Sequence, residues 1–153
     1  MIQIEKSQRT LKLIRNGETL FCCRIMLGEN PIGPKEREGD GKTPEGCYRI
    51  CSVNRQSKFH ISLGINYPSK KDALQALRGK MICLFDFVKI CAADMLHLRP
   101  SWNTPLGGFI MIHGQSPEGK TGDWTKGCVA LGDADIEKLA SFCKRGEQVI
   151  ILP

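Results

Sequence analysis

The chain has 153 residues, of which 41% are hydrophobic and 25% are charged. This length suits a single domain, residues 1–153, that buries a core without disulfide bonds, and the composition excludes a disordered chain. The formal net charge is +6, but lysine and arginine are spread along the sequence without a dense basic run. The sequence therefore predicts no nucleic-acid partner.

The first part of the chain is typical of paired strands. Residues 1–7 and 10–15 alternate apolar and polar side chains, a pattern that predicts strands. Asn16-Gly17 suits the two positive-φ positions of a type I′ hairpin turn, so we expect residues 18–27 to return as the partner strand.

A long loop separates this hairpin from two further strands. Residues 28–46 are rich in glycine, proline and charged side chains. A connection of this length exceeds the usual one and is typically functional or disordered. Residues 47–53 and 60–65 then predict two strands.

Two helices are expected in the middle of the chain. Residues 69–79 predict a helix with Ser69 as its N-cap and Gly79 near its end. Residues 81–98 are almost wholly apolar, and at about 100° per residue the polar side chains share one arc of roughly 140°: Asp86, Lys89, Asp94 and His97. We therefore expect a mostly buried helix with one narrow wet face, since these polar groups argue against stable membrane insertion.

The last third alternates strands with one helix. Residues 107–114 and 127–132 predict short strands, and residues 134–145 predict a helix with Asp133 as its N-cap and basic residues in its last turn. Residues 147–152 close the chain as a strand. Strands outnumber helices, so the sequence predicts a mainly β, α+β domain.

Eight cysteines are many for this length, and their spacing is irregular: 22, 23, 47, 51, 83, 91, 128 and 143. Most lie within apolar runs, which is typical of free, buried cysteine. A disulfide framework is the weaker interpretation for a chain of this size. A zinc site built from the first four remains an alternative, but no paired CxxC motif supports it, so we expect no metal and no cofactor.

The sequence is compatible with two cellular compartments. The first residues, MIQIEKSQRT, contain no apolar segment of the kind found in a secretory signal. The protein is therefore cytoplasmic, or it is periplasmic or cell-wall associated and an export signal has been removed. We expect a monomer in either case.

The segment 111–131, MIHGQSPEGKTGDWTKGCVAL, contains the candidate chemistry. His113 ends an expected strand, and Cys128 begins the next one after a glycine. An imidazole beside a thiol is a common means of activating a nucleophilic cysteine, and backbone N–H groups at Gly127 and Cys128 are candidate oxyanion donors. Two buried residues that bracket a polar loop would give the same pattern, so the residues alone leave both interpretations open.

The motif TKGCVAL after IHG resembles the signature of the L,D-transpeptidase (YkuD) catalytic domain family. The stretches MLGENPIGPKEREGDGKTPEGCYRI, FHISLGINYP and DWTKGCVAL resemble the YafK/ErfK-like branch of that family. The resemblance implies a β-sandwich-like fold of mixed sheets with packed helices. It also implies cysteine acyl transfer on peptidoglycan stem peptides, which would be the partners of the protein.

Carried over to this sequence, the resemblance implies that Cys128 is the nucleophile, that His113 is the general base and that Gly127 acts through its backbone. Further residues are candidates for substrate binding, each with a plain structural role as its alternative: Thr125, Trp124, His60, Arg37 and Lys42. Asp40 in the long loop is a weaker candidate for the same role.

Two features depart from the family pattern, Ala130 and the apolar segment 81–98. Ala130 stands where many relatives have an arginine that binds a substrate carboxylate, and the DWT sequence before the motif is similar to a branch linked with hydrolysis. The apolar segment 81–98 is an insertion that we interpret as extra core rather than a cap over the site. A hydrolase of the same family, and a wall-binding module without catalysis, therefore remain alternatives to an acyltransferase.

Overall fold

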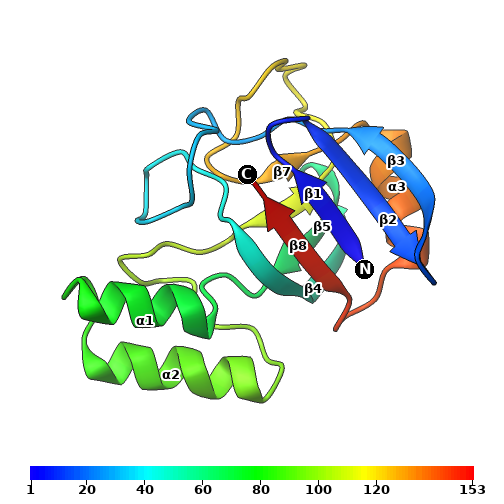
Figure 1. Cartoon of the computed structure of the whole chain (residues 1–153). Helices are drawn as coiled ribbons and strands as arrows, with labels where there is room; N and C mark the ends of the chain where they lie inside the picture. Colours follow the sequence, from blue (N-terminus) through cyan, green and yellow to red (C-terminus); the bar gives the residue numbers. More distant parts are fainter.

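The computed structural model describes all 153 residues (Figure 1). Its eight strands form one mixed sheet in the order β3-β2-β1-β8-β4-β5-β6-β7. The strand bounds are β1 Ile2–Glu5, β2 Thr10–Arg15, β3 Glu18–Arg24, β4 Gly46–Ser57, β5 His60–Ile65, β6 Met111–His113, β7 Val129–Ala130 and β8 Gln148–Leu152. Three helices accompany them: α1 Lys70–Arg78, α2 Leu84–Met95 and α3 Asp133–Phe142. The mainly β, α+β prediction is confirmed.

The sheet curls until its two edges meet. Met26, just beyond β3, exchanges two backbone hydrogen bonds of 2.8 Å with Ala130 of β7. Parallel pairings join β1 to β8 and β6 to β7, whereas the other neighbours are antiparallel. A single cluster of 24 buried residues fills the curled sheet and the space under α3. Edge closure of this kind leaves no long unpaired strand edge.

Local sequence rules located most strands. Asn16 and Gly17 both have positive φ, of 51° and 82°, so the hairpin turn between β2 and β3 is as expected. β4 is longer than predicted, and β6 and β7 are shorter. The chain between β6 and β7 leaves the sheet and forms one wall of a pocket.

Helix ends follow capping chemistry in one case and not in another. Ser69 and Asp72 form a reciprocal capping box at the start of α1, the arrangement that satisfies two free N–H groups at once. The predicted cap of α3 is wrong: Gly132 occupies the N-cap position, and the Asp133 carboxylate accepts the Gln115 N–H instead. α3 ends at Phe142, so the basic residues after it lie outside its last turn.

The expectation for α2 is also wrong. α1 and α2 form a hairpin that projects from one end of the sheet (Figure 1). Only Ile90 of α2 is fully buried, whereas Leu84, Phe85, Val88 and Met95 are all more than half exposed. The insertion is therefore not a mostly buried helix, and it contributes only Ile82 and Ile90 to a small second core beside α1.

The cysteines are all free, and they divide more evenly between surface and core than expected. Cys22, Cys47 and Cys83 are exposed, whereas Cys23, Cys51 and Cys143 are buried. No three His, Cys, Asp or Glu side chains are close enough to hold a metal ion. No helix is both long and apolar enough to cross a bilayer.

Candidate active site

Strand pairing brings Cys128 and His113 to the same face of the sheet. β6 and β7 are parallel, with Ile112 opposite Val129 and His113 opposite Ala130. Cys128 is thus one step before this register, beside Met111, whose N–H points to the Cys128 sulfur at 3.4 Å. Because side chains two positions apart on a strand share a face, Met111, His113 and Cys128 all point the same way.

Both side chains line one pocket of about 470 Å³. Its walls come from the β4–β5 turn, the end of β6 and the loop that precedes β7: Lys58, Phe59, His113, Ser116, Pro117, Glu118, Lys120, Trp124, Thr125, Lys126 and Cys128. Hollows of similar volume occur elsewhere, for example one of about 450 Å³ beside Arg9 and Asp123. The chemistry of its lining, not its size, distinguishes the pocket that holds the cysteine and the histidine.

Aromatic rings hold the His113 imidazole in place. The Phe59 ring stacks on it with centroids 4.4 Å apart and planes 20° apart, and the Trp124 ring meets it edge-on at 5.7 Å. His113 Nδ1 lies 2.7 Å from the Gly114 carbonyl oxygen. A carbonyl can only accept a hydrogen bond, so Nδ1 carries the proton, and Nε2 of the neutral ring has a free lone pair.

Both reactive groups are kept neutral. Burial lowers the pKa of His113, and nearby Lys58 lowers it further, against an opposing hydrogen bond to Gly114. Removal of its sulfur from water raises the pKa of Cys128, although the Met111 N–H and the cations Lys35 and Lys58 partly offset this shift. The raised pKa of Cys128 and the lowered pKa of His113 both favour a resting pair of thiol and neutral imidazole.

The turn before Cys128 is fastened from within. The buried Thr125 hydroxyl donates to the Cys128 carbonyl at 2.7 Å and accepts from the Gly127 N–H at 3.1 Å. Gly127 is therefore not free to donate to a substrate oxyanion, contrary to the expectation. Both hydrogen bonds of Thr125 stay within the turn, which they hold in shape, and Thr125 also lines the pocket. The Cys128 N–H, by contrast, has no partner within the chain.

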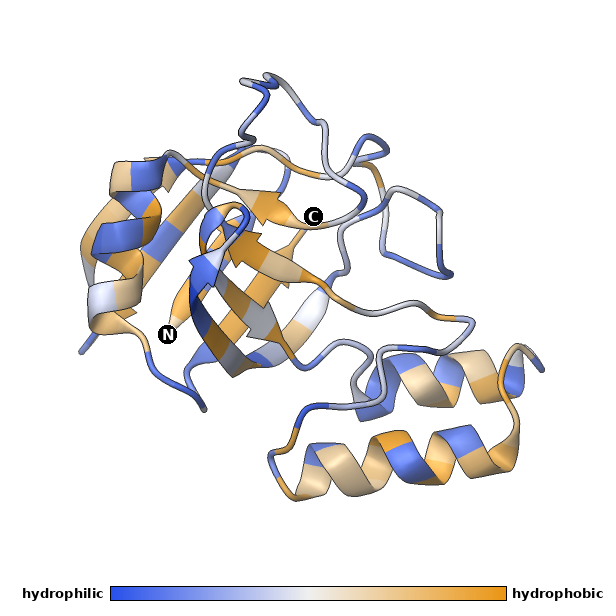
Figure 2. Cartoon of the chain, turned by 180° about the vertical axis from the view of Figure 1, so that it is seen from behind, coloured by the Kyte–Doolittle hydropathy of each residue, from blue (hydrophilic) through white to orange (hydrophobic).

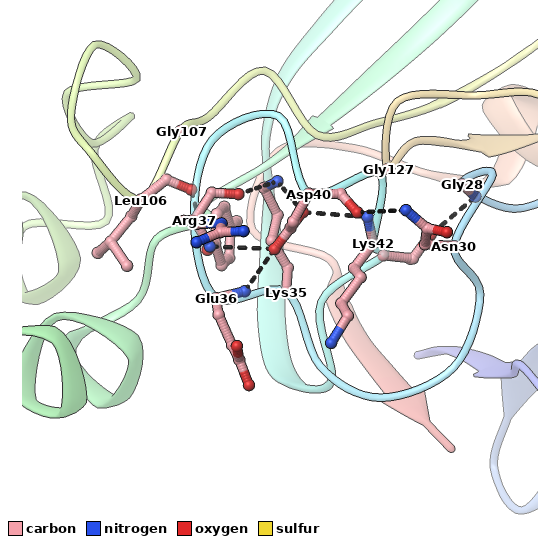
Figure 3. Close-up of polar contacts among 12 residues, drawn as sticks. Gly28, Asn30, Lys35, Glu36, Arg37, Asp40, Lys42, Leu106, Gly107 and Gly127 are labelled. Atoms are coloured by element: carbon pink, nitrogen blue, oxygen red, sulfur yellow. Dashed lines mark hydrogen bonds and ion pairs between the residues drawn. The ribbon is translucent and has the colours of Figure 1, made fainter.

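The long loop 28–46 is ordered and supports this turn. The Asp40 carboxylate accepts hydrogen bonds from Lys35 Nζ at 2.8 Å and from the N–H groups of Glu36, Arg37 and Lys42 (Figure 3). Burial alone would raise the pKa of Asp40, but these hydrogen bonds lower it overall. Asp40 therefore organises the loop.

The loop packs directly against the glycine before the nucleophile. Gly127 has φ of +116°, and a Cβ there would lie 2.5 Å from the Lys42 carbonyl oxygen. A positive φ and a close backbone approach both require glycine at this position. The loop is also tied to the start of the chain. Buried Lys6, just after β1, donates hydrogen bonds to the Gly33 and Thr43 carbonyl oxygens of the loop and pairs with Glu45 at 2.7 Å.

Three predicted binding residues lie outside the pocket. His60 pairs with Glu137 of α3 at 2.6 Å, while Arg37 and Lys42 belong to the long loop. Trp124 does line the pocket, and its buried indole N–H has no hydrogen-bond partner.

Sequence reasoning missed Lys58, Phe59 and Lys126. Lys58 and Phe59 form the tip of the β4–β5 hairpin, next to His60, and Lys126 is the variable position of the TKGC motif. The expected strand at 60–65 and its preceding turn were the available signal, because a hairpin tip lies beside the end of the neighbouring strand. Neither Lys58 nor Lys126 forms an ion pair.

Comparisons with known proteins agree with this geometry. The family model for the L,D-transpeptidase catalytic domain, YkuD, matches residues 1–151. A curated relative, the putative L,D-transpeptidase YafK of Escherichia coli K12, is 33% identical over 89 residues, which is 54% of this chain and 36% of the relative. The chain therefore spans about a third of the length of this curated relative.

Solved structures share the fold. The helical cell shape determining protein Pgp2 of Campylobacter jejuni has a TM-score of 0.68 at 24% identity, over 98% of this chain and 46% of its own. L,D-transpeptidase 1 of Mycobacterium tuberculosis has a TM-score of 0.56 at 12% identity, over 100% of this chain and 61% of its own. At these identities the likeness bears on the fold alone.

Proposed function

Because the chain belongs to the L,D-transpeptidase catalytic domain family, YkuD, we propose that it catalyses cysteine-dependent acyl transfer on peptidoglycan stem peptides. The observation that carries the proposal is the shared pocket of Cys128 and His113, with the second ring nitrogen of His113 held as an acceptor. The proposal places the protein at the cell wall, as a monomer.

The first half-reaction forms a thioester. As the Cys128 sulfur attacks the peptide carbonyl carbon, His113 Nε2 takes the thiol proton, so no free thiolate has to exist beforehand. The unpartnered Cys128 N–H is the proposed donor to the oxyanion that develops. When the C–N bond breaks, the imidazolium returns the proton to the leaving amine.

The neutral resting pair fits this order of events. The raised pKa of Cys128 and the lowered pKa of His113 both oppose early charge separation. A substrate that excludes water from the pocket leaves a neutral pair undisturbed, whereas it would penalise a preformed ion pair. We therefore propose concerted proton transfer during attack.

Two lysines of the pocket would supply the positive charge that many relatives carry on an arginine at the position of Ala130. Ala130 is fully buried in β7 and bridges Met26, so it is not at the pocket surface. Lys58 and Lys126 line the pocket without a carboxylate partner, whereas Lys120 pairs with Glu118 at 2.9 Å. We propose that the two free lysines attract the carboxylates of the stem peptide, and that the Trp124 indole N–H donates to a substrate carbonyl. An unpaired buried donor is costly unless a ligand satisfies it.

The second half-reaction decides between transfer and hydrolysis. An amine or a water molecule attacks the thioester carbonyl, His113 takes its proton, and the Cys128 thiol is restored. A lysine is a point charge and does not hold a carboxylate in two places as an arginine fork does. We therefore favour water or a short amine over a second stem peptide as the acceptor.

Defined muropeptides test the whole scheme. The protein is incubated with a disaccharide tetrapeptide, with and without an acceptor amine, and the products are identified by mass. Abundant 3–3 crosslinked dimers would refute the hydrolytic preference, whereas trimmed monomers would support it. Cys128→Ala and His113→Ala should both abolish turnover, and Cys47→Ala, which removes an exposed cysteine outside the pocket, should not.

Acylation is a sharper readout than alkylation for this chain. Cys22, Cys47 and Cys83 are exposed and would react with iodoacetamide whether or not they are catalytic. A carbapenem, whose ring carbonyl is open to nucleophilic attack, should instead add one equivalent of mass at Cys128 alone. Addition at any other cysteine would overturn the assignment. A wall-binding module without catalysis would bind muropeptides and give no adduct.

A further inference from the structure

Helix α2 presents its apolar face to solvent. Its outward residues fall within an arc of roughly 120° at 100° per residue: Leu84, Phe85, Val88, Ala92, Met95 and Leu96. The large side chains among them are 54 to 75% exposed. Figure 2 shows α2 as the outermost element of the hairpin, mostly in hydrophobic colours.

The inward face of α2 is held against the domain by Asp94 and by a small apolar core. Asp94 accepts hydrogen bonds from Arg49 of β4 at 2.9 Å and from Asn66 at 2.8 Å. Ile90 and the half-buried Phe87 pack against α1. These contacts determine the rotation of the helix, so its apolar side cannot turn inward without breaking them.

The basic and acidic side chains of the hairpin also differ in their exposure to solvent. Between residues 70 and 99 every lysine and arginine is exposed: Lys70, Lys71, Arg78, Lys80, Lys89 and Arg99. None of the three acidic side chains in this range is fully exposed, and each has an internal partner: Asp72, Asp86 and Asp94. The fully exposed charges of the hairpin are therefore all positive, whereas its carboxylates are only partly exposed.

The cations border the apolar face. Lys89 is next to it on α2 and lies 4.0 Å from the centre of the Phe85 ring. Lys80 precedes α2, beside the exposed Met81, and Arg99 follows it. From this combination we propose that the α1–α2 hairpin docks on the surface of an anionic lipid bilayer, with α2 in the interface plane.

The chemistry of the face selects this occupant. A helix that buries an apolar stripe in the acyl boundary and places lysine and arginine at headgroup level binds anionic membranes. The 12 residues of α2 span about 18 Å, which suits a helix lying on a bilayer and not one crossing it. Self-association through the same face would bring the exposed Lys89 side chains of two copies together, and like charges repel each other.

Vesicle sedimentation tests the proposal. The protein should sediment with vesicles of phosphatidylcholine and phosphatidylglycerol, bind pure phosphatidylcholine weakly, and be released by high salt. The double variant Phe85→Ser/Val88→Ser should weaken binding at least about tenfold, since two apolar anchors are lost. Lys89→Gln should weaken it about fivefold at low salt.

Matched controls separate docking from folding and from catalysis. Leu20→Ser/Ile32→Ser removes two exposed apolar side chains outside the hairpin and should leave binding unchanged. Cys128→Ala should also bind normally, because docking does not depend on the proposed chemistry. Absence of sedimentation with anionic vesicles would overturn the proposal. So would a dimer in the absence of lipid that the Phe85→Ser/Val88→Ser change dissociates, since that result assigns the face to a second copy.

Discussion

Replacement of Gly127 by alanine tests whether the long loop supports the nucleophile. An alanine at the φ of +116° found there costs about 1–2 kcal/mol of conformational strain. Its Cβ would also lie 2.5 Å from the Lys42 carbonyl oxygen and 3.2 Å from Ile110 Cδ1. Because a backbone oxygen cannot rotate away, overpacking adds about 1–3 kcal/mol. We therefore expect Gly127→Ala to lose about 2–5 kcal/mol of unfolding free energy.

Gly17→Ala is the matched control. Gly17 also has positive φ, of 82°, but nothing lies within 4 Å of a Cβ built there. Its loss should be strain alone, about 1–2 kcal/mol. Urea denaturation of both variants gives the two free energies. Equal losses would show that the contact with Lys42 is unimportant and would refute the reasoning.

The same variant should impair the proposed chemistry beyond its effect on folding. Small domains are stable by about 5–15 kcal/mol, so most Gly127→Ala molecules should remain folded in the assay. The loop and the turn must still move apart, which displaces the Cys128 N–H and sulfur from the pocket. Carbapenem acylation should fall by at least about tenfold, while Gly17→Ala should react like the parent protein.

Two further predictions concern charged groups near the site. Lys58→Gln should raise the pKa of His113, because Lys58 lowers it; the acidic limb of the acylation–pH profile should then move to higher pH, and an unmoved limb would contradict His113 as the base. Asp40→Asn should cost about 3 kcal/mol of unfolding free energy in urea, since it leaves buried Lys35 without its counter-charge, whereas Glu5→Gln, which breaks the more accessible pair with Lys12, should change the unfolding free energy far less. The folded-state pKa of Asp40 is lowered, so its stabilisation is present above the ordinary carboxyl range and lost as pH falls through that lowered value; the deficit of Asp40→Asn should shrink in acid.

Local patterns were sufficient where a structural element is determined by its own residues. The Asn16-Gly17 turn, the strands that flank it and the Ser69 cap follow from backbone preferences and one or two side chains. The position of His113 and Cys128 on one pocket also follows from the sequence, because each ends or begins a strand and the loop between them leaves room for a parallel pairing.

The expectation for α2 failed because its orientation depends on residues far away in the chain. The sequence pattern placed Asp94 on a solvent-exposed face, but its carboxylate accepts hydrogen bonds from Arg49 and Asn66 on the side that faces the protein. A polar arc on a helix does not reveal whether water or a buried partner satisfies it. The cap of α3 failed for a similar reason, since Gln115 competes for the Asp133 carboxylate.

The pocket loop and the α1–α2 hairpin are well separated in the fold. The loop that walls the pocket, residues 114–124, lies at one end, and the α1–α2 hairpin lies at the other in both views (Figures 1 and 2). The proposed docking face and the pocket therefore lie on different elements of one small domain, the former on α2 and the latter on the β4–β5 turn, β6 and the loop before β7. Together the two proposals describe a domain that rests on a membrane and acts on peptidoglycan.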